Sequence, residues 1–118
     1  MGYKSFEDLD VWKRACRLAV EIYATLKSCS DYSFRDQMQR AAISIPSNIA
    51  EGAERNSNKD FARFLHIAKG SAAELRTQLY IAEKVTIIKT SKRKELCEEL
   101  MIISKMLQAL VSSLKPNL

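Results

Sequence analysis

Glycine, proline and cysteine are all scarce in this chain of 118 residues, which has three, two and three of them respectively. All-β proteins need turn residues at intervals of roughly 8–12 positions, so the shortage of glycine and proline excludes that class. The three cysteines, Cys16, Cys29 and Cys97, are too few for a disulfide framework and have no metal-ligand spacing. We therefore expect reduced thiols in a cytoplasmic protein. Long apolar runs are also missing, which argues against a membrane-spanning helix and a secretory signal.

The chain is instead rich in helical periodicity, because apolar side chains recur three and four positions apart in four successive segments. The first segment is expected to bury Leu9, Trp12, Cys16, Ala19, Tyr23 and Leu26. The second is expected to bury Met38, Ala41, Ala42, Ile45, Ile49 and Ala53. The third is expected to bury Phe61, Phe64, Leu65, Ala68, Ala72, Leu75, Leu79 and Ala82. The last is expected to bury Leu96, Leu100, Ile103, Leu107, Leu110 and Leu114.

Capping residues and short connections indicate how these four segments are arranged. Asn58 and Ser91 are predicted N-caps of the third and fourth helices, and Pro116 is predicted to end the fourth. Because the connections are short, successive helices must be antiparallel neighbours. The sequence therefore predicts an all-α fold, an antiparallel up-down four-helix bundle formed by a single domain over 1–118, with 1–7 as a short arm.

Pro46 lies in the middle of the second segment, which is predicted to run over 34–54. A proline inside a helix removes one backbone hydrogen bond and clashes with the preceding turn. We expect either a kink at this proline or a break into two shorter helices.

Residue patterns for catalysis or cofactor binding are absent from the sequence. A di-iron bundle needs two Glu-x-x-His motifs, and the chain has one histidine, His66, with Arg63 three positions before it. No phosphate-binding loop, dinucleotide motif or zinc-protease motif occurs. Nothing in the sequence brings His66 and Cys97 together as a dyad. We expect a protein that is not an enzyme and binds neither metal nor cofactor.

A polar stripe borders the apolar face of the second and third segments. Its members are Gln37, Arg40, Ser44, Asn48, Glu51, Ser71 and Glu74, with Gln78 beside the last. Gly70 lies near the stripe, and a mid-helix glycine costs about 1 kcal/mol relative to alanine, so we expect another backbone to approach it closely. One interpretation is a buried hydrogen-bond network that fixes helix register. The other is a polar patch for a ligand or a neighbouring subunit.

Basic residues outnumber acidic ones by 19 to 14, which gives a formal charge of +5. The run Lys92, Arg93 and Lys94 has no acid within it and is predicted to bind phosphate. The full set of candidate nucleic-acid-binding residues is Lys89, Lys92, Arg93, Lys94, Lys13, Arg14, Arg17 and Arg63. No aromatic cluster is interleaved with them, so sequence-independent and salt-dependent binding is expected. The alternative is that the charge only keeps a helical bundle in solution.

Two stretches resemble the 23S rRNA intervening-sequence protein family, also called S23 ribosomal proteins. They are FEDLDVWKRA at 6–15 and QMQRAAISIPSNIAEGAERNSNKDFARFLHIAKGSAAELRTQL at 37–79. The resemblance implies a compact bundle, which several members assemble into a homopentamer. It also implies similarity to accessory proteins of diversity-generating retroelements, which bind nucleic acid and a reverse transcriptase. Members often close the third helix with a glycine where this chain has Val85 and Thr86, so we expect a differently shaped loop there.

Two functions therefore stay open. One is a non-enzymatic homo-oligomer, a pentamer by resemblance, that binds RNA or DNA and has a protein partner such as a reverse transcriptase. The other is a structural or protein-interaction bundle with no nucleic-acid role. Self-association is also favoured by apolar residues beyond the need of one small core, namely Trp12, Phe34, Ile102, Met106 and Val111.

Overall fold

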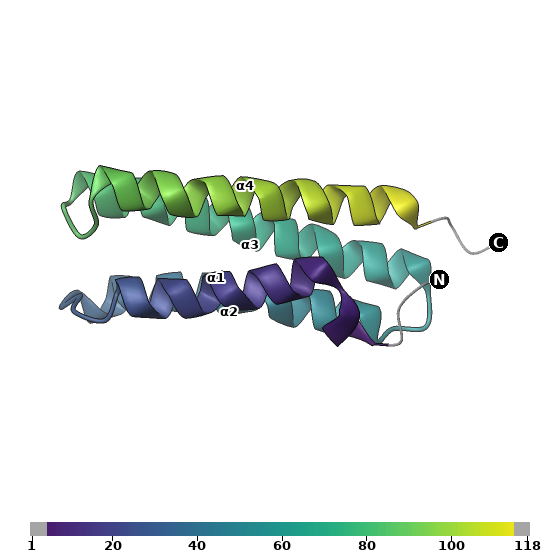
Figure 1. The fold of residues 1–118 in the computed structure, drawn as a ribbon. Coiled ribbons are helices and arrows are strands. Elements are labelled where there is room, and N and C mark those ends of the chain that lie inside the picture. The colour runs from purple at the N-terminus through teal and green to yellow at the C-terminus, as the bar shows by residue number, and fades with distance from the viewer. Residues whose placement is uncertain (1–4, 115–118) are drawn as a thin grey trace.

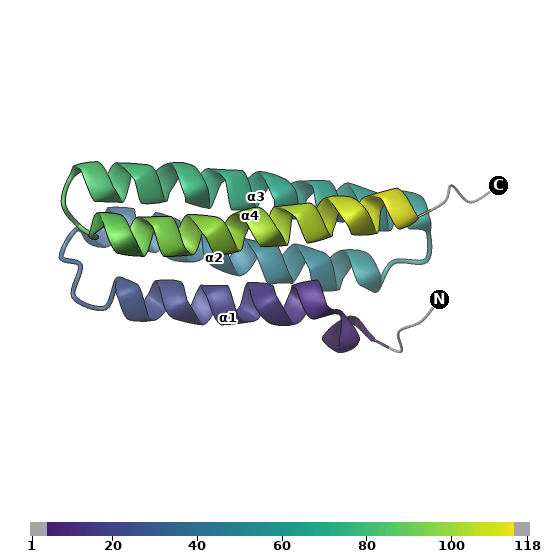
Figure 2. The same ribbon diagram turned by 45° about the horizontal axis from the view of Figure 1, so that its top comes forward.

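The computed structural model describes residues 5–114 and contains four α-helices and one short 3₁₀ helix, with no strand in that part of the chain. The elements are η1 (Phe6–Asp8), α1 (Asp10–Thr25), α2 (Tyr32–Ala53), α3 (Asn58–Lys84) and α4 (Thr90–Ser113). Successive helices run antiparallel and side by side along one axis (Figures 1 and 2). The pair α2–α3 packs most extensively and the pair α1–α4 least. The predicted all-α four-helix bundle is confirmed.

The helix ends differ in detail from the predicted ones. Ser57, one residue before the predicted cap, accepts a hydrogen bond from the Asp60 backbone N–H at 3.1 Å. Helix α4 begins at Thr90 and not after the predicted cap Ser91. Lys89, which precedes it, makes no capping hydrogen bond with its side chain. The predicted end at Pro116 lies outside the described residues, which place the last turn of α4 at Ser113. Of the predicted arm, the described part forms η1, whose Phe6 ring packs edge-on against Trp12 at 5.2 Å.

The core contains the predicted stripes of α2, α3 and most of α4, but the stripe of α1 is shifted. Its buried residues are Val11, Ala15, Leu18, Ala19, Ile22 and Leu26. Trp12 and Cys16 are half-buried, and Tyr23 is 45% exposed. Two overlapping stripes with helical spacing exist in α1, and the structure buries the one made of smaller aliphatic side chains. Smaller side chains let α1 lie close to α2, whereas a tyrosine keeps its hydroxyl in water.

Pro46 is buried within α2, which continues from Tyr32 to Ala53. The predicted alternative of a break into two helices is therefore wrong, and the kink stays a prediction. An interior proline costs a helix about 3 kcal/mol. Burial of the neighbouring Ile45 and Ile49 against the rest of the core offsets that cost.

Two residues after the end of α3, Thr86 adopts a left-handed conformation with φ of 64°. The Ile87 N–H donates to the Ala82 carbonyl at 2.8 Å and the Thr86 N–H donates to the Glu83 carbonyl at 3.1 Å. These two bonds define a Schellman motif, whose left-handed position usually belongs to glycine. The backbone thus adopts the conformation that a glycine would favour, with a β-branched residue in its place.

None of the helices in residues 5–114 combines the length and the hydropathy that crossing a lipid bilayer requires.

Candidate nucleic-acid interface

The basic run at the start of α4 is largely engaged in ion pairs within the chain. The Lys92 ammonium contacts Glu21 of α1 at 2.6 Å and Glu95 at 3.5 Å. The Arg93 guanidinium donates to Glu83 of α3 at 2.7 Å, and the two side chains are only 15% and 18% exposed. The run has no acid within it, but it has acidic neighbours in space, and its binding of phosphate stays a prediction. Of these acids, Glu21 lies in α1, 71 positions from Lys92, whereas Glu83 lies in α3, across the turn that precedes α4, and Glu95 lies in α4 itself.

The pair of Arg93 and Glu83 belongs to a cluster that joins the end of α3 to the start of α4. The Arg93 guanidinium lies 4.4 Å from the centre of the Tyr80 ring, and the Thr90 hydroxyl donates to Glu83 at 2.6 Å. Hydrogen bonds from Thr90 and Arg93 lower the pKa of the Glu83 carboxyl below its ordinary value. Glu83 likewise raises the pKa of Arg93. This side of α4 thus stabilises the turn between two helices.

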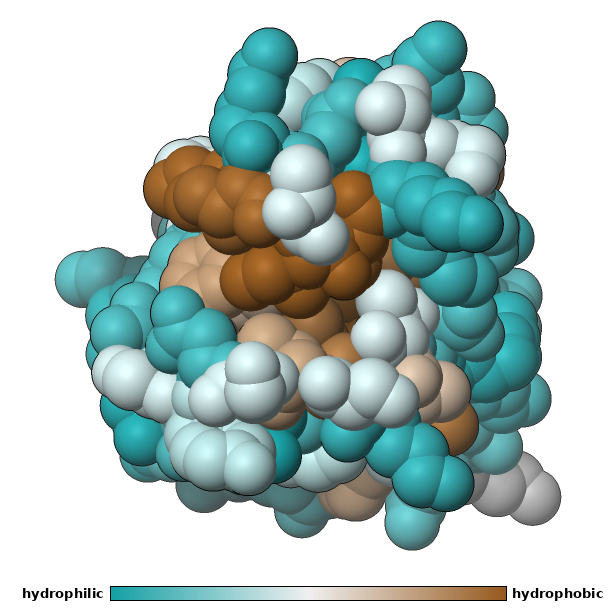
Figure 3. Space-filling model, turned by 90° about the vertical axis from the view of Figure 1, so that its left-hand side faces the viewer, coloured by the Kyte–Doolittle hydropathy of each residue, from teal (hydrophilic) through white to brown (hydrophobic). Residues whose placement is uncertain are grey.

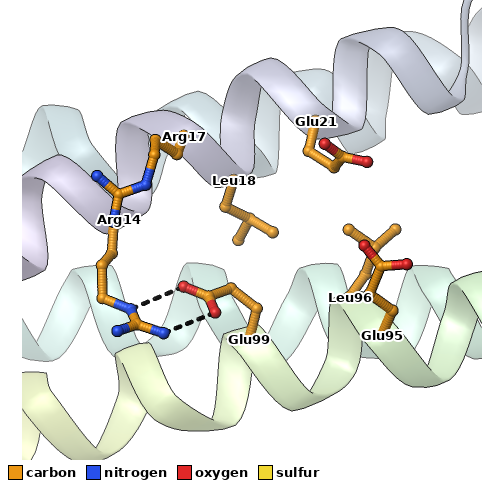
Figure 4. A pocket seen from close by; sticks show the side chains of 7 residues that line it. All are labelled: Arg14, Arg17, Leu18, Glu21, Glu95, Leu96 and Glu99. Carbon is orange, nitrogen blue, oxygen red and sulfur yellow. Dashed lines mark hydrogen bonds and ion pairs between the residues drawn. The ribbon is translucent and has the colours of Figure 1, made fainter.

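A groove of about 340 Å³ separates α1 from α4. Its lining residues are Arg14, Arg17, Leu18, Glu21, Glu95, Leu96 and Glu99. Figure 4 shows Arg14 reaching from α1 to Glu99 of α4, with two hydrogen bonds of 2.8 Å each. The three glutamates of the lining repel phosphate, so the groove is a poor anion site.

Arg63 is also partly engaged, because it lies 3.7 Å from Asp60 and over the ring of Phe64. The remaining four predicted cations are Lys13, Arg17, Lys89 and Lys94. Lys13 and Arg17 are exposed and lie one turn apart on α1, and Lys89 and Lys94 are exposed at the start of α4. Arg17 lies at the edge of the groove, and Figure 4 shows its guanidinium toward Arg14 and away from Glu21 and Glu95. Over residues 5–114, no carboxylate lies within ion-pair distance of any of the four.

The polar stripe forms a hydrogen-bond network between α2 and α3. The hydroxyls of Ser44 and Ser71 lie 2.8 Å apart, and the Asn48 amide donates to the Ser44 carbonyl at 2.8 Å and to its hydroxyl at 2.9 Å. Ser71 is buried. These contacts favour the structural interpretation for the centre of the stripe.

The outer members of the stripe remain exposed, and they are Gln37, Arg40, Glu51 and Glu74. Glu51 forms an ion pair with Arg55 at 3.0 Å, and Gln78 donates to Glu74 at 3.5 Å. The other amide atom of Gln78, Oε1, is buried and has no hydrogen-bond partner among the described residues. The two carboxylates belong to separate contacts and form no acid–base pair.

The close helix approach predicted at Gly70 occurs at Gly52 instead. A Cβ added at Gly52 would lie 2.7 Å from the Phe64 Cβ and 3.1 Å from the Phe61 ring, whereas one added at Gly70 meets no atom of the described chain within 4 Å. The prediction for Gly70 was therefore wrong within the chain. Gly52 lies against two buried aromatic residues of the next helix, Phe61 and Phe64. The position of Gly52 in the sequence, near the end of α2, does not predict this contact.

The histidine and the buried cysteine form no catalytic pair. His66 is exposed on α3, whereas Cys97 is buried and burial raises the pKa of its thiol. A raised thiol pKa disfavours the nucleophilic thiolate. The described part of the chain also has no cluster of three or more His, Cys, Asp or Glu side chains arranged to hold a metal ion.

A family model described as 23S rRNA-intervening sequence protein matches residues 7–109. The chain belongs to this family. A crystal structure of a protein with unknown function from the S23 ribosomal protein family, from Bacteroides thetaiotaomicron, has the same fold with a TM-score of 0.81. The two chains are 24% identical over 87% of this chain and 99% of the other. No curated protein matches the sequence of this intervening-sequence protein.

Proposed function

We propose that this intervening-sequence protein is a non-enzymatic, self-associating bundle that binds RNA through the basic side chains its fold leaves unpaired. The supporting observation is the division of the eight candidate cations into two groups. Arg14, Lys92, Arg93 and Arg63 contact carboxylates of the same chain. Lys13, Arg17, Lys89 and Lys94 keep their charge available to a phosphate.

Lys13 and Arg17 form the best-placed pair of the second group. Residues four apart on a helix lie on one face with about 5–6 Å between their Cβ atoms, so these two can contact neighbouring phosphates of one strand. Binding of this kind depends on charge and not on base sequence. The preference for RNA over DNA comes from the family resemblance, as does a protein partner such as a reverse transcriptase.

Self-association is supported by large apolar side chains left on the surface. Val20 of α1 is 70% exposed, and Ile43, Ile67 and Ile102 on the other three helices are each more than 40% exposed. Of the residues predicted to be surplus to the core, Trp12, Phe34, Met106 and Val111 pack against it as half-buried side chains, and Ile102 is exposed. The resemblance favours five copies, which would repeat the Lys13–Arg17 pair around a ring and add avidity. The free thiols of Cys16, Cys29 and Cys97 support a cytoplasmic location.

Fluorescence anisotropy with a labelled single-stranded RNA at low salt tests the RNA claim. The variant Lys13→Ala/Arg17→Ala should weaken binding about tenfold or more, since it removes two phosphate contacts. The matched control Lys59→Ala/Lys105→Ala removes the same charge from exposed residues of α3 and α4 and should weaken binding much less. Equal losses would mean that only net charge matters. No binding by the unchanged protein would leave the structural or protein-interaction bundle as its function.

Sedimentation equilibrium at tens of micromolar tests self-association separately. A mass above one protomer supports the proposal, and five protomers would agree with the resemblance. A monomer under these conditions would contradict it.

A further inference from the structure

A hollow of about 450 Å³ lies on the surface between α1 and α2. Its lining residues are Tyr23, Asp36, Gln39, Arg40, Ile43 and Ser44. Tyr23 is the one residue that α1 contributes, and it is 45% exposed. The sequence predicts this tyrosine in the core, but the shifted buried face of α1 leaves its ring in the wall of the hollow. An exposed aromatic ring offers a flat apolar surface on which a planar group stacks.

Arg40 gives the hollow a cation that the fold leaves unpaired. It is exposed, and no carboxylate of residues 5–114 lies within ion-pair distance of its guanidinium. Asp36, the one acid in the lining, instead contacts the Arg35 guanidinium at 3.3 Å. The amide of Gln39 adds a hydrogen-bond donor and an acceptor. The hollow thus combines a ring for stacking, a positive charge and groups that hydrogen-bond.

The hollow lies close to the Lys13–Arg17 pair along α1. Tyr23 follows Arg17 by six residues, which corresponds to about 9 Å along the axis of an α-helix. Stacked nucleotides rise about 3.4 Å along a helical strand, so about three of them span this distance. Lys27, one turn after Tyr23, is exposed and has no carboxylate partner in the described chain. A strand held by Lys13 and Arg17 therefore passes the hollow with cations on both sides of it.

The end of the bundle where α1 leads into α2 offers no such ring, although Lys84 and Lys89 are exposed there. Figure 3 views this end, where apolar surface gathers in the middle and hydrophilic side chains surround it. A cavity of about 300 Å³ at this end is lined by hydroxyl, thiol and carboxylate side chains, with Ile87 as its one aliphatic residue. No aromatic side chain of the described residues lines it. This end attracts phosphate through its lysines but gives a base nothing to stack on.

We infer that an unpaired base of single-stranded RNA enters the hollow between α1 and α2 and stacks on the Tyr23 ring, while Arg40 contacts a neighbouring phosphate. The inference rests on the proposed RNA binding and deepens it, because it specifies the state of the RNA at this place. In a duplex each base is paired and stacked between its neighbours, so none is available to the ring. Stacking accepts every base, which keeps the binding independent of base sequence.

Fluorescence anisotropy with matched RNA probes tests the inference on the whole chain. The probes are a single-stranded decamer of adenine nucleotides, an abasic decamer with the same phosphates, and a duplex of ten base pairs. Tyr23→Ala should weaken binding of the adenine strand about tenfold, because it removes the ring on which a base stacks. Binding of the abasic strand and of the duplex should change by less than about twofold. The salt slope should stay unchanged, since tyrosine carries no charge.

Three further variants locate the contact. Tyr23→Phe keeps the ring and should bind the adenine strand as the unchanged protein does. Tyr80→Ala removes a tyrosine of similar exposure, 47%, from α3 and should leave RNA binding within about twofold. Arg40→Gln should weaken binding of the adenine and abasic strands alike and lower the magnitude of the salt slope by about 0.7, the contribution of one phosphate contact. Circular dichroism of each variant shows that it is folded.

Two results would overturn the inference while the unchanged protein still binds RNA. One is an adenine strand that binds Tyr23→Ala as tightly as it binds the unchanged protein. The other is an equal loss for the adenine strand, the abasic strand and the duplex, which would mean that the ring does not contact a base. Absence of RNA binding by the unchanged protein would contradict the proposed function and this inference together, so the two kinds of failure are distinguishable.

Discussion

Arg14 of α1 and Glu99 of α4 form a two-pronged ion pair, with Nε and one terminal nitrogen of the guanidinium each 2.8 Å from a carboxylate oxygen. The residues are 85 positions apart in the sequence and join the two helices that pack least extensively against each other. Both side chains are about one-third exposed, so the pair is screened by water and salt. It closes the bundle at the seam where apolar packing contributes least.

Removal of this ion pair should make the bundle easier to unfold. Glu99→Gln keeps the size of the side chain and removes its charge, so we expect a lower urea midpoint than that of the unchanged protein. The difference between the two midpoints should be smaller at high salt, because salt already weakens the ion pair in the unchanged protein. Urea unfolding followed by circular dichroism at two salt concentrations measures both effects. Glu98→Gln, on the exposed side of the same helix, is the control. A loss that is identical at both salt concentrations would mean that the contact is not electrostatic.

Relief of the left-handed conformation at Thr86 should stabilise the protein. Thr86→Gly is expected to raise the free energy of unfolding by about 1 kcal/mol, because glycine adopts positive φ without steric cost. Thr77→Gly, the same exchange in the exposed middle of α3, should lower it by roughly 0.5 kcal/mol because glycine is a poor helix residue. Thermal unfolding of both variants tests the contrast. A less stable Thr86→Gly variant would contradict the strain argument.

The two helical glycines should respond to alanine in opposite directions. Gly52→Ala forces a methyl group into the Phe61–Phe64 contact, and we expect a loss of about 1–3 kcal/mol from overpacking. Gly70→Ala adds a methyl group where the described chain leaves open space and should gain about 1 kcal/mol from helix propensity. Chemical denaturation gives both values. Destabilisation by both would mean that a second molecule covers Gly70, and sedimentation of that variant would then show weaker association.

Acid should weaken the contact between α3 and α4 through Glu83. Its pKa is lower in the folded protein because Thr90 and Arg93 hydrogen-bond to its charged form, so the unfolded chain takes up the proton first as the pH falls. The stabilisation is complete above the unfolded pKa and is lost as the pH falls through the folded pKa. Glu83→Gln should therefore flatten the fall of stability with acid. An unchanged slope in this variant would show that other carboxylates carry the acid sensitivity.

Periodicity alone predicted the fold, because helical spacing and short connections leave few arrangements for four helices. It misplaced the buried face of α1, where the stripe through Val11 and Ile22 competes with the stripe through Trp12 and Tyr23. The candidate site was harder to predict. Lys92 pairs with Glu21 of α1, 71 positions away, and the order of charges along the chain does not predict that contact. The ion pair of Arg93 with Glu83 forms across the turn between α3 and α4, and its geometry is likewise set by the fold. The same holds for the approach of Phe64 to Gly52.

The salt dependence of RNA binding tests the division of the cations most directly. Each phosphate contact contributes about 0.7–0.9 to the slope of log affinity against log salt. Lys13→Ala/Arg17→Ala should therefore lower the magnitude of the slope by about 1.4–1.8, while Lys92→Gln, whose lysine already contacts Glu21, should leave the slope unchanged. A flattened slope in Lys92→Gln with an unchanged slope in Lys13→Ala/Arg17→Ala would contradict the account.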